Sequence, residues 1–491
     1  MDRSSKDADE RTAIRKCADS LPFSVDALDL EGCLATVETL ESAAETLYTS
    51  DHSEGPEDTE SEQGDDEYGS LLSVYRNLTR SEASGPLSGV RIGIKDNIAA
   101  RGLAMTCGSN TVSFVPSYDA AVVERLQKEG ATIVGKTNMD AFGFGPSGEF
   151  SERKRVINPI LPERVPGGSS SGSGAAVAAG LLDIGIGTDT GGSVRIPAAC
   201  CGIVGAKPTH GLVPRHGLVG FAPSLDTIGP LARDVSTAAT TLEAMAGHDR
   251  RDPSSHCTRP GSLSELRTDL EEPLEVGIVT PFFERSTEVV SDAISTALND
   301  IEDHPSITVS TVDLALGRIE EAYYLTGATE FAWLLCQDGI VRGQGTGYEE
   351  QWRHAFVEAT ESGTLSSHVA ERVLPSIYLD AESRGKAYTA ARRETTAFVE
   401  RLNDCFDAVD LLLMPTIRSL PPKPGQISAS ERLNDLLGNT APFNLSGMPA
   451  VSLPVAIHDG IPVSAQVVAP RFEDDVALTG AHLIERAVDT E

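Results

Sequence analysis

From about residue 85 onward, the chain alternates short apolar runs with helix-like segments, and this alternation restricts the fold more than any other feature. The runs have the length and β-branched content of buried strands, as in GVRIGI (89–94), LLDIGIG (181–187) and LEVGIV (274–279). Helical patterns lie between them, such as residues 120–129, which Gly130 would terminate. Strands that alternate with helices predict an α/β protein whose sheet is covered by helices.

No linker-like segment follows residue 85, so we expect one large domain over residues 85–491. The stretch of about 240–400 has a more irregular pattern, and we expect it to form an insertion that contacts the substrate.

The first 80 residues have a different character. Residues 26–49 repeat apolar side chains at helical spacing and predict an amphipathic helix, so we expect residues 1–49 to form a helical arm. Residues 50–67 contain nine acidic residues and no lysine or arginine. Self-repulsion with little apolar content favours disorder, and residues 50–80 are therefore predicted to be a linker.

The overall composition excludes several classes of function. With 73 acidic and 40 basic residues, the net charge of -33 argues against direct nucleic-acid binding, which needs clustered lysine and arginine. Only nine of the basic residues are lysines, a composition that suits an acidic surface kept soluble in high salt. The eight cysteines form no C-x-x-C pair, and no apolar run reaches the roughly 18 residues of a membrane span. We expect a soluble cytoplasmic protein without membrane contact.

The stretch RVPGGSSSGSGAAVAAG, residues 164–180, joins a Gly/Ser run to a small-residue helix former. It fits the G-x-S-x-G elbow with Ser170 as nucleophile, but the elbow must follow a buried strand, and three prolines precede it here. It lacks the Lys-Ser/Thr ending of a phosphate-binding loop, and a plain linker would not run directly into a packed helix. The remaining interpretation is a Gly/Ser loop at a helix N-terminus, where small side chains allow backbone and hydroxyl groups to lie close to a reacting group.

A second glycine-rich stretch follows the apolar run at 181–187. Consecutive glycines before Ser193 allow neighbouring N–H groups to point at one spot, as an oxyanion hole requires. Asp189 and Arg195 are expected to pair beneath this loop and to hold its shape. The simpler interpretation is a glycine turn with a capping serine.

A third stretch, GVRIGIKDNI (89–98), alternates apolar residues on one strand face and sends Lys95 to the other side at the strand end. A lysine at a strand end is usually solvated. A lysine amid apolar residues nevertheless stands out in a chain with so few lysines, which makes Lys95 a candidate catalytic residue.

Taken together and in this order, IKDN, GGSSSGS and DTGGSVR resemble the amidase signature family, and the likeness extends over nearly the whole chain from residue 85. The resemblance implies a mixed, twisted β-sheet with helices on both faces. It also implies Ser193 as nucleophile, Ser169 as a bridging serine after a cis Gly168–Ser169 bond, and Lys95 as base. The backbone N–H groups implied for the oxyanion hole are those of Thr190, Gly191, Gly192 and Ser193. No metal or organic cofactor is implied.

The resemblance leaves the substrate open between two branches of the family. AYYLTGATEFAWLLCQDGIVRG (322–343) is similar to the glutamine-hydrolysing chain of tRNA-dependent amidotransferases, the A-type subunit, which passes ammonia from glutamine to a partner; Arg372 would then bind the glutamine carboxylate. Yet TNMDAFGFGPSGEFS (137–151) departs from that pattern, and Leu437 stands where an acidic residue is expected. Asp435, two places away, and Ser147 are the further candidate substrate contacts.

We therefore expect a stand-alone amidase that hydrolyses a small carboxamide, because NTAPFNLSGMPA (439–450) is more similar to such enzymes. The alternative is an A-type chain that works with B- and C-type amidotransferase subunits. A non-catalytic binding or scaffold protein on this fold is the third possibility.

Overall fold

The structure is a computed structural model. It describes residues 3–20, 29–48, 61–76, 83–257, 261–268, 270–337, 339, 350–362, 365–427 and 430–488. The chain divides into two compact units, residues 1–54 and residues 55–491, which are described separately.

The first unit contains two helices, α1 (Arg3–Ser20) and α2 (Leu30–Tyr48), and an ion pair between Arg11 and Glu31 joins them. Helix α2 lies within the segment where the apolar spacing predicts a helix. The sequence pattern does not predict α1, because RSSKDADERTAIRKCADS has no apolar stripe from which a period can be read.

The second unit is built on one twelve-stranded sheet with the strand order β1-β2-β4-β3-β5-β7-β6-β11-β12-β10-β8-β9. The strands are β1 (Ser61–Gln63), β2 (Leu71–Tyr75), β3 (Arg91–Lys95), β4 (Thr132–Thr137), β5 (Ile184–Asp189), β6 (Val204–Lys207), β7 (Thr227–Ala232), β8 (Leu274–Val279), β9 (Ile307–Val312), β10 (Leu411–Pro415), β11 (Ala450–His458) and β12 (Ile461–Val468). Strand β3 pairs in parallel with β4 and β5, whereas β5 pairs antiparallel with β7. The prediction of a mixed sheet is confirmed.

Helices cover both faces of this sheet. They are α3 (Ala121–Lys128), α4 (Ser171–Ala178), α5 (Arg195–Cys201), α6 (Val235–Met245), α7 (Thr280–Glu284), α8 (Glu288–Glu302), α9 (Ile319–Cys336), α10 (Glu350–Ser362), α11 (Ser367–Ser383), α12 (Lys386–Phe406), α13 (Ser430–Leu437), α14 (Pro442–Leu445) and α15 (Asp474–Ala487), with a short 3-10 helix at Ala141–Gly143. Alternate residues of strand β10 face the two helical layers. Leu411 and Leu413 pack in the core cluster that includes residues of α8 and α15. Leu412 and Met414 pack in the core cluster that includes residues of α7 and α12.

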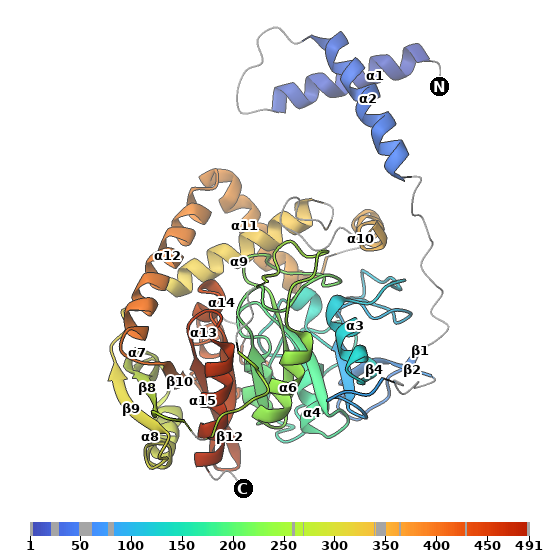
Figure 1. Ribbon diagram of the computed structural model, residues 1–491. Coiled ribbons are helices and arrows are strands. Elements are labelled where there is room, and N and C mark those ends of the chain that lie inside the picture. Colours follow the sequence, from blue (N-terminus) through green and yellow to red (C-terminus); the bar gives the residue numbers. More distant parts are fainter. Residues whose placement is uncertain are drawn as a thin grey trace. The chain divides into compact units, whose positions relative to one another are not determined.

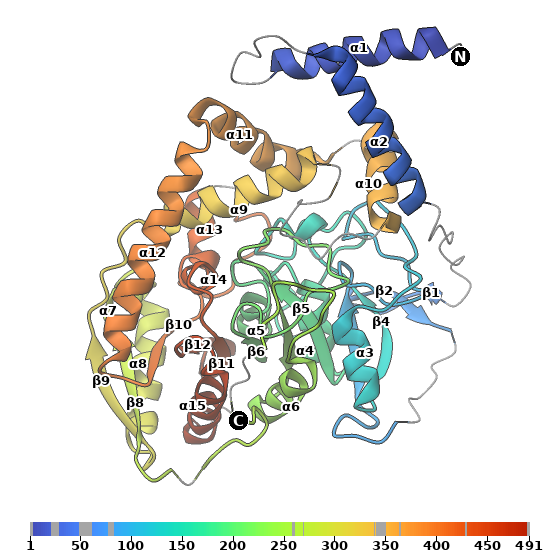
Figure 2. The same cartoon turned by 45° about the horizontal axis from the view of Figure 1, so that its top comes forward.

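Helices α9, α11 and α12 pack against one another, and both views show them together at one end of this unit (Figures 1 and 2). Among the described residues, none of the helices combines the length and the hydropathy that a membrane crossing requires.

Strand β3 lies near the centre of the sheet and is buried apart from its first residue. Ile92 and Ile94 are fully buried, as their alternation predicts. Gly93 is required between them, because a Cβ atom there would lie 2.3 Å from Leu182 Cδ1 and 2.6 Å from Thr137 Cγ2. Tight packing on both sides of β3 therefore places the next residue but one, Lys95, in a closed environment.

Two predictions of organisation need correction. The expected linker is wrong for residues 61–76, which contain β1 and β2 and form an edge of the sheet by pairing with β4; residues 50–60 and 77–80 lie outside the described residues. The prediction of disorder rests on the acidic residues and overlooks the apolar run Leu71–Tyr75, which forms strand β2 and pairs with β4. The stretch of about 240–400 is also more regular than expected, because its described part contains β8, β9 and the helices α7 to α11.

Candidate active site

The candidate site forms where Lys95 ends strand β3. Its side chain is fully buried, and Nζ donates hydrogen bonds to Ser169 Oγ at 2.8 Å and to Thr188 Oγ1 at 2.7 Å. Thr188 belongs to the neighbouring strand β5, and Ser169 to the loop before α4. The structure thus brings two of the three predicted catalytic residues into contact, and adds Thr188, for which the sequence motifs predict no role.

Burial lowers the pKa of Lys95 to about 7, although the carboxylates of Asp140, Asp189 and Asp226 act in the opposite direction. Desolvation disfavours the charged ammonium, whereas nearby negative charges favour it. Because desolvation is the larger effect, a substantial share of Lys95 is neutral at neutral pH and has a lone pair to accept a proton. A base of this kind needs no histidine.

The loop that carries Ser169 is tightly enclosed. The Gly168–Ser169 peptide bond is cis, as the resemblance implies. A Cβ atom on Gly168 would lie 2.1 Å from Asp140 Oδ2, which explains why glycine precedes the serine. Ser170 Oγ donates to the Thr188 carbonyl at 3.2 Å, so Ser170 shapes the loop and is not an exposed nucleophile.

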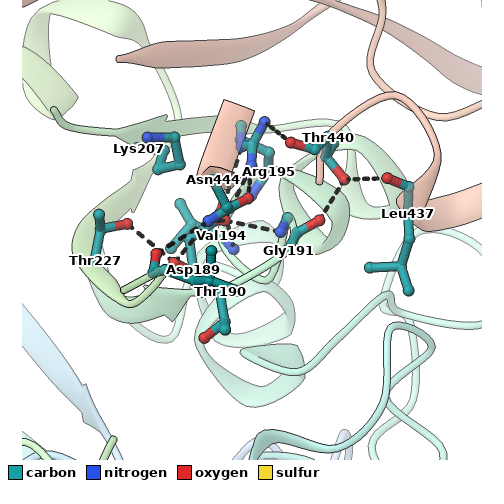
Figure 3. A network of polar contacts seen from close by, with 12 residues as sticks. Asp189, Thr190, Gly191, Val194, Arg195, Lys207, Thr227, Leu437, Thr440 and Asn444 are labelled. Atoms are coloured by element: carbon teal, nitrogen blue, oxygen red, sulfur yellow. Dashed lines mark hydrogen bonds and ion pairs between the residues drawn. The ribbon is translucent and has the colours of Figure 1, made fainter. Parts of the chain in front are cut away.

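The loop that carries Ser193 rests on the buried ion pair of Asp189 and Arg195, with 3.0 Å between Arg195 Nη2 and Asp189 Oδ1 (Figure 3). Burial alone would raise the pKa of Asp189, but Arg195 outweighs it and the pKa falls to about 2. Arg195 also donates to Asn444 Oδ1 and to the Thr440 carbonyl, so strand end, loop and α14 are held together. The predicted pairing of Asp189 with Arg195 is thus present in the structure.

One member of the predicted oxyanion hole is already occupied. The backbone N–H of Gly192 donates to Asp189 Oδ1 at 2.8 Å, so it supports the loop and does not face a substrate. Gly191 lies beneath Tyr323, whose hydroxyl oxygen would be 2.0 Å from a Cβ atom at that position. Thr190 Oγ1 donates to Asp226 Oδ1 at 2.5 Å, which fixes the start of the loop.

No hydrogen bond joins the hydroxyls of Ser169 and Ser193 in the part of the chain that the structure describes. Their loops are connected instead through the backbone, where Ser170 N–H donates to the Ser193 carbonyl at 3.3 Å. Hydrogen bonds between catalytic groups are often long before the substrate binds.

Ser193 opens into a cavity of about 360 Å³. Its lining is mostly apolar and aromatic: Gly143, Phe144, Gly145, Pro146, Thr190, Ser193, Phe221, Tyr323, Tyr324, Leu325, Gly327, Ala328, Thr329, Glu371, Arg372, Pro375, Ser376, Leu379, Leu433 and Leu437. Of the three candidate substrate contacts, Arg372 lines this cavity, whereas Asp435 and Ser147 do not. Leu437, at the position where an acidic residue is expected, is among the lining residues.

An aromatic wall forms one side of the cavity, and the sequence motifs do not predict it. The rings of Phe144 and Phe221 lie 4.5 Å apart, and both pack against Phe331 at 4.7 and 4.8 Å between centroids. Phe144 lies in the 137–151 stretch, whose departure from the amidotransferase pattern already indicates an altered substrate pocket. Its contacts with residues 77 and 187 positions away could not be read from the sequence.

The comparisons with known proteins agree with this fold. Residues 71–478 match the protein family described as Amidase, and the chain belongs to this family. It is 39% identical over 422 residues, 84% of its length and 99% of the relative's, to the A subunit of the Glutamyl-tRNA(Gln) amidotransferase of Halobacterium salinarum.

Two solved structures have the same fold. The A subunit of the Glutamyl-tRNA(Gln) amidotransferase of Thermotoga maritima has 32% sequence identity and a TM-score of 0.70, over 85% of this chain and 87% of that one. The 6-aminohexanoate cyclic dimer hydrolase has 26% identity and a TM-score of 0.71, over 83% and 86%.

Proposed function

We propose that this protein hydrolyses the side-chain amide of glutamine and supplies the ammonia to a partner, as an A-type subunit of a tRNA-dependent amidotransferase. One observation carries the proposal: Arg372 lines the same cavity as Ser193, and no described carboxylate forms an ion pair with it. An arginine in that position suits a substrate that carries a carboxylate as well as an amide. The similarity to an amidotransferase A-type chain over 99% of that relative's length supports the same function.

In the proposed mechanism, neutral Lys95 accepts a proton from Ser169 while Ser169 accepts one from Ser193. Ser193 Oγ then attacks the amide carbonyl carbon, and the carbonyl oxygen becomes an oxyanion. The proton returns through Ser169 to the nitrogen, the C–N bond breaks, and ammonia leaves an acyl-enzyme on Ser193. Water takes the reverse route, releases the carboxylate product and restores the serine.

The oxyanion would be held by backbone N–H groups at Thr190, Gly191 and Ser193. Gly192 is left out of this set because its N–H is bound to Asp189. Loss of one such donor costs about 3 to 4 kcal/mol of transition-state stabilisation. The paired Asp189 and Arg195 beneath the loop would keep these donors aligned.

Partner chains are part of the proposal. A chain of net charge -33 is poorly suited to binding tRNA directly, so a B-type subunit, with a C-type subunit, would bind the tRNA and use the ammonia.

The test is ammonia release in high salt by the purified protein, alone and with B- and C-type subunits, from glutamine, asparagine, and simple aliphatic and aromatic amides. Glutamine hydrolysis that rises when the partners are added is the expected result. The Ser193→Ala variant is the matched control; if it releases ammonia as fast as the parent, catalysis through Ser193 is wrong and a binding or scaffold role returns.

A stand-alone carboxamide amidase is the second candidate, favoured by Leu437. This residue lines the cavity at the position expected to bear the acid for the glutamine ammonium group, and most of the lining is apolar. An apolar pocket favours an apolar acyl group. Rapid hydrolysis of simple amides without partners, together with inactivity towards glutamine, would establish this candidate.

A further inference from the structure

Two neighbouring residues of α11, Glu371 and Arg372, carry opposite charges and both line the cavity that contains Ser193. We infer that Glu371 is a specificity-determining residue that binds the α-ammonium group of an amino-acid substrate, beside the carboxylate site at Arg372. This inference rests on the proposed glutamine hydrolysis. It assigns to α11 the contact that Leu437 cannot make.

The carboxylates of Glu371 and Asp140 act on the guanidinium of Arg372 and favour its charged form, but neither of them forms a close ion pair with it. Among the described residues, no ion pair involves Glu371 or Arg372. Arg372 Nη1 donates to the carbonyl of His368 at 2.8 Å and lies 2.9 Å from His368 Nδ1. His368 Nε2 contacts the Phe144 carbonyl, so Nε2 carries the proton and Nδ1 accepts from the arginine. The histidine therefore holds the guanidinium in place without cancelling its charge.

The rest of the cavity offers no other acceptor of comparable strength for an ammonium group. Of the lining residues that the structure describes, Glu371 is the one carboxylate. Apart from Arg372, the other polar side chains there are hydroxyls: Thr190, Ser193, Tyr323, Tyr324, Thr329 and Ser376. A desolvated ammonium group needs an opposite charge or several acceptors. The apolar residues of the lining supply no hydrogen bonds, and a neutral hydroxyl is a weaker acceptor for an ammonium group than the carboxylate of Glu371.

The pairing also matches the chemistry of the substrate. An α-amino acid bears its carboxylate and its ammonium group on one carbon atom, so a site for both needs opposite charges side by side. Glu371 and Arg372 provide two opposite charges in the lining of one cavity. The exposed position of Glu371 places it at the cavity rim, so the amide end of the substrate would extend inward to Ser193.

The experiment compares L-glutamine with 4-carbamoylbutanoate, which is the same molecule without its α-amino group. Steady-state kcat/KM is measured for the parent, Glu371→Gln, and the matched control Glu382→Gln, which changes an exposed glutamate of α11 outside the cavity lining. We expect the parent to prefer glutamine by about 10- to 100-fold, the range of a hydrogen bond to a charged group. Glu371→Gln should lose that preference through KM, while the control keeps it.

A second variant and a binding measurement keep the inference testable if hydrolysis is weak. Leu437→Asp in the Glu371→Gln background should restore the preference for glutamine. Calorimetry with Ser193→Ala measures binding of both compounds without turnover. Equal affinity of Ser193→Ala for the two compounds, or an unchanged preference in Glu371→Gln, would overturn the role of Glu371. Selective glutamine binding without any ammonia release by the parent would instead contradict the proposed function alone.

Discussion

The contact between Lys95 and Thr188 leads to a quantitative prediction for the Thr188→Val variant. The hydroxyl oxygen of Thr188 accepts a hydrogen bond from Lys95 Nζ at 2.7 Å in a fully enclosed environment. Valine has a similar shape but no acceptor. The substitution therefore removes one polar partner of the amine and leaves its contact with Ser169 in place.

The magnitude follows from the two protonation states of Lys95. A hydrogen bond is worth about 1.5 to 3 kcal/mol when one partner is charged and about 0.5 to 1.5 kcal/mol when both are neutral. Loss of the acceptor thus disfavours the ammonium by about 1 kcal/mol more than the amine, which lowers the pKa by about 0.7 of a pH unit. The carboxylates of Asp140, Asp189 and Asp226, which raise this pKa, are unchanged.

The sign of the effect on activity is fixed by the role of Lys95 as a base. Activity rises as pH increases through the pKa of Lys95, near 7 in the parent, because only the neutral amine accepts a proton. We expect the acid limb of the kcat/KM profile to move to lower pH in Thr188→Val. The maximal kcat/KM at high pH should also fall, because Lys95 is a weaker base and has lost one of its two hydrogen bonds.

The assay is a pH profile of kcat/KM from about pH 5 to pH 9 for the parent, Thr188→Val and Thr188→Ser. Thr188→Ser keeps the hydroxyl and should retain the parental profile. Thr241→Val, which removes a buried hydroxyl that donates to the Thr237 carbonyl within α6, controls for a general loss of stability. An acid limb that stays in place or moves to higher pH in Thr188→Val would refute the reasoning, as would a Thr188→Ser profile equal to that of Thr188→Val.

Three further predictions concern the ion pair, the carboxylate site and the surface charge. Arg195→Met leaves Asp189 buried without its partner and should lower the free energy of unfolding by about 3 to 5 kcal/mol. Arg91→Met, which breaks the exposed pair with Asp183, should cost about 1 kcal/mol or less by chemical denaturation. Arg372→Gln should raise KM for glutamine about 10- to 100-fold with a smaller change in kcat, and an unaltered KM would exclude this arginine from substrate binding. The melting temperature should rise with KCl concentration, because salt screens the repulsion of a net charge of -33; a constant value between low and high salt would contradict that expectation.

The candidate catalytic residues stand out in the sequence because each lies in a short local motif. Lys95 follows an alternating strand, and Ser193 follows two glycines at a strand end, so local pattern and the family resemblance lead to the same residues. The alternation of apolar runs with helical segments also predicts a sheet covered by helices, whereas the mixed strand directions follow only from the family resemblance.

Features that depend on distant segments could not be predicted. The use of Gly192 N–H by Asp189 depends on the side-chain geometry of a turn, and the same glycine pair fits an oxyanion hole equally well on sequence alone. The strands β1 and β2 lie in a segment whose acidic composition favours disorder, whereas in the structure β2 pairs with the distant strand β4 and β1 pairs with β2. The cavity wall combines residues from separate parts of the chain, and no periodic pattern in the sequence indicates that these parts lie together.

The position of the three proposed catalytic residues along the chain has a consequence for how such an enzyme changes over evolution. Lys95, Ser169 and Ser193 all come from residues 95–193, whereas much of the cavity wall comes from α9, α11 and α13, further along the chain. Mutations in these helices can therefore alter the acyl group that is accepted while the proton relay stays intact. The architecture allows new substrates to be acquired by gradual exchange of the later helices, and it marks residues 319–437 as the segment to transplant between relatives in engineering amide selectivity.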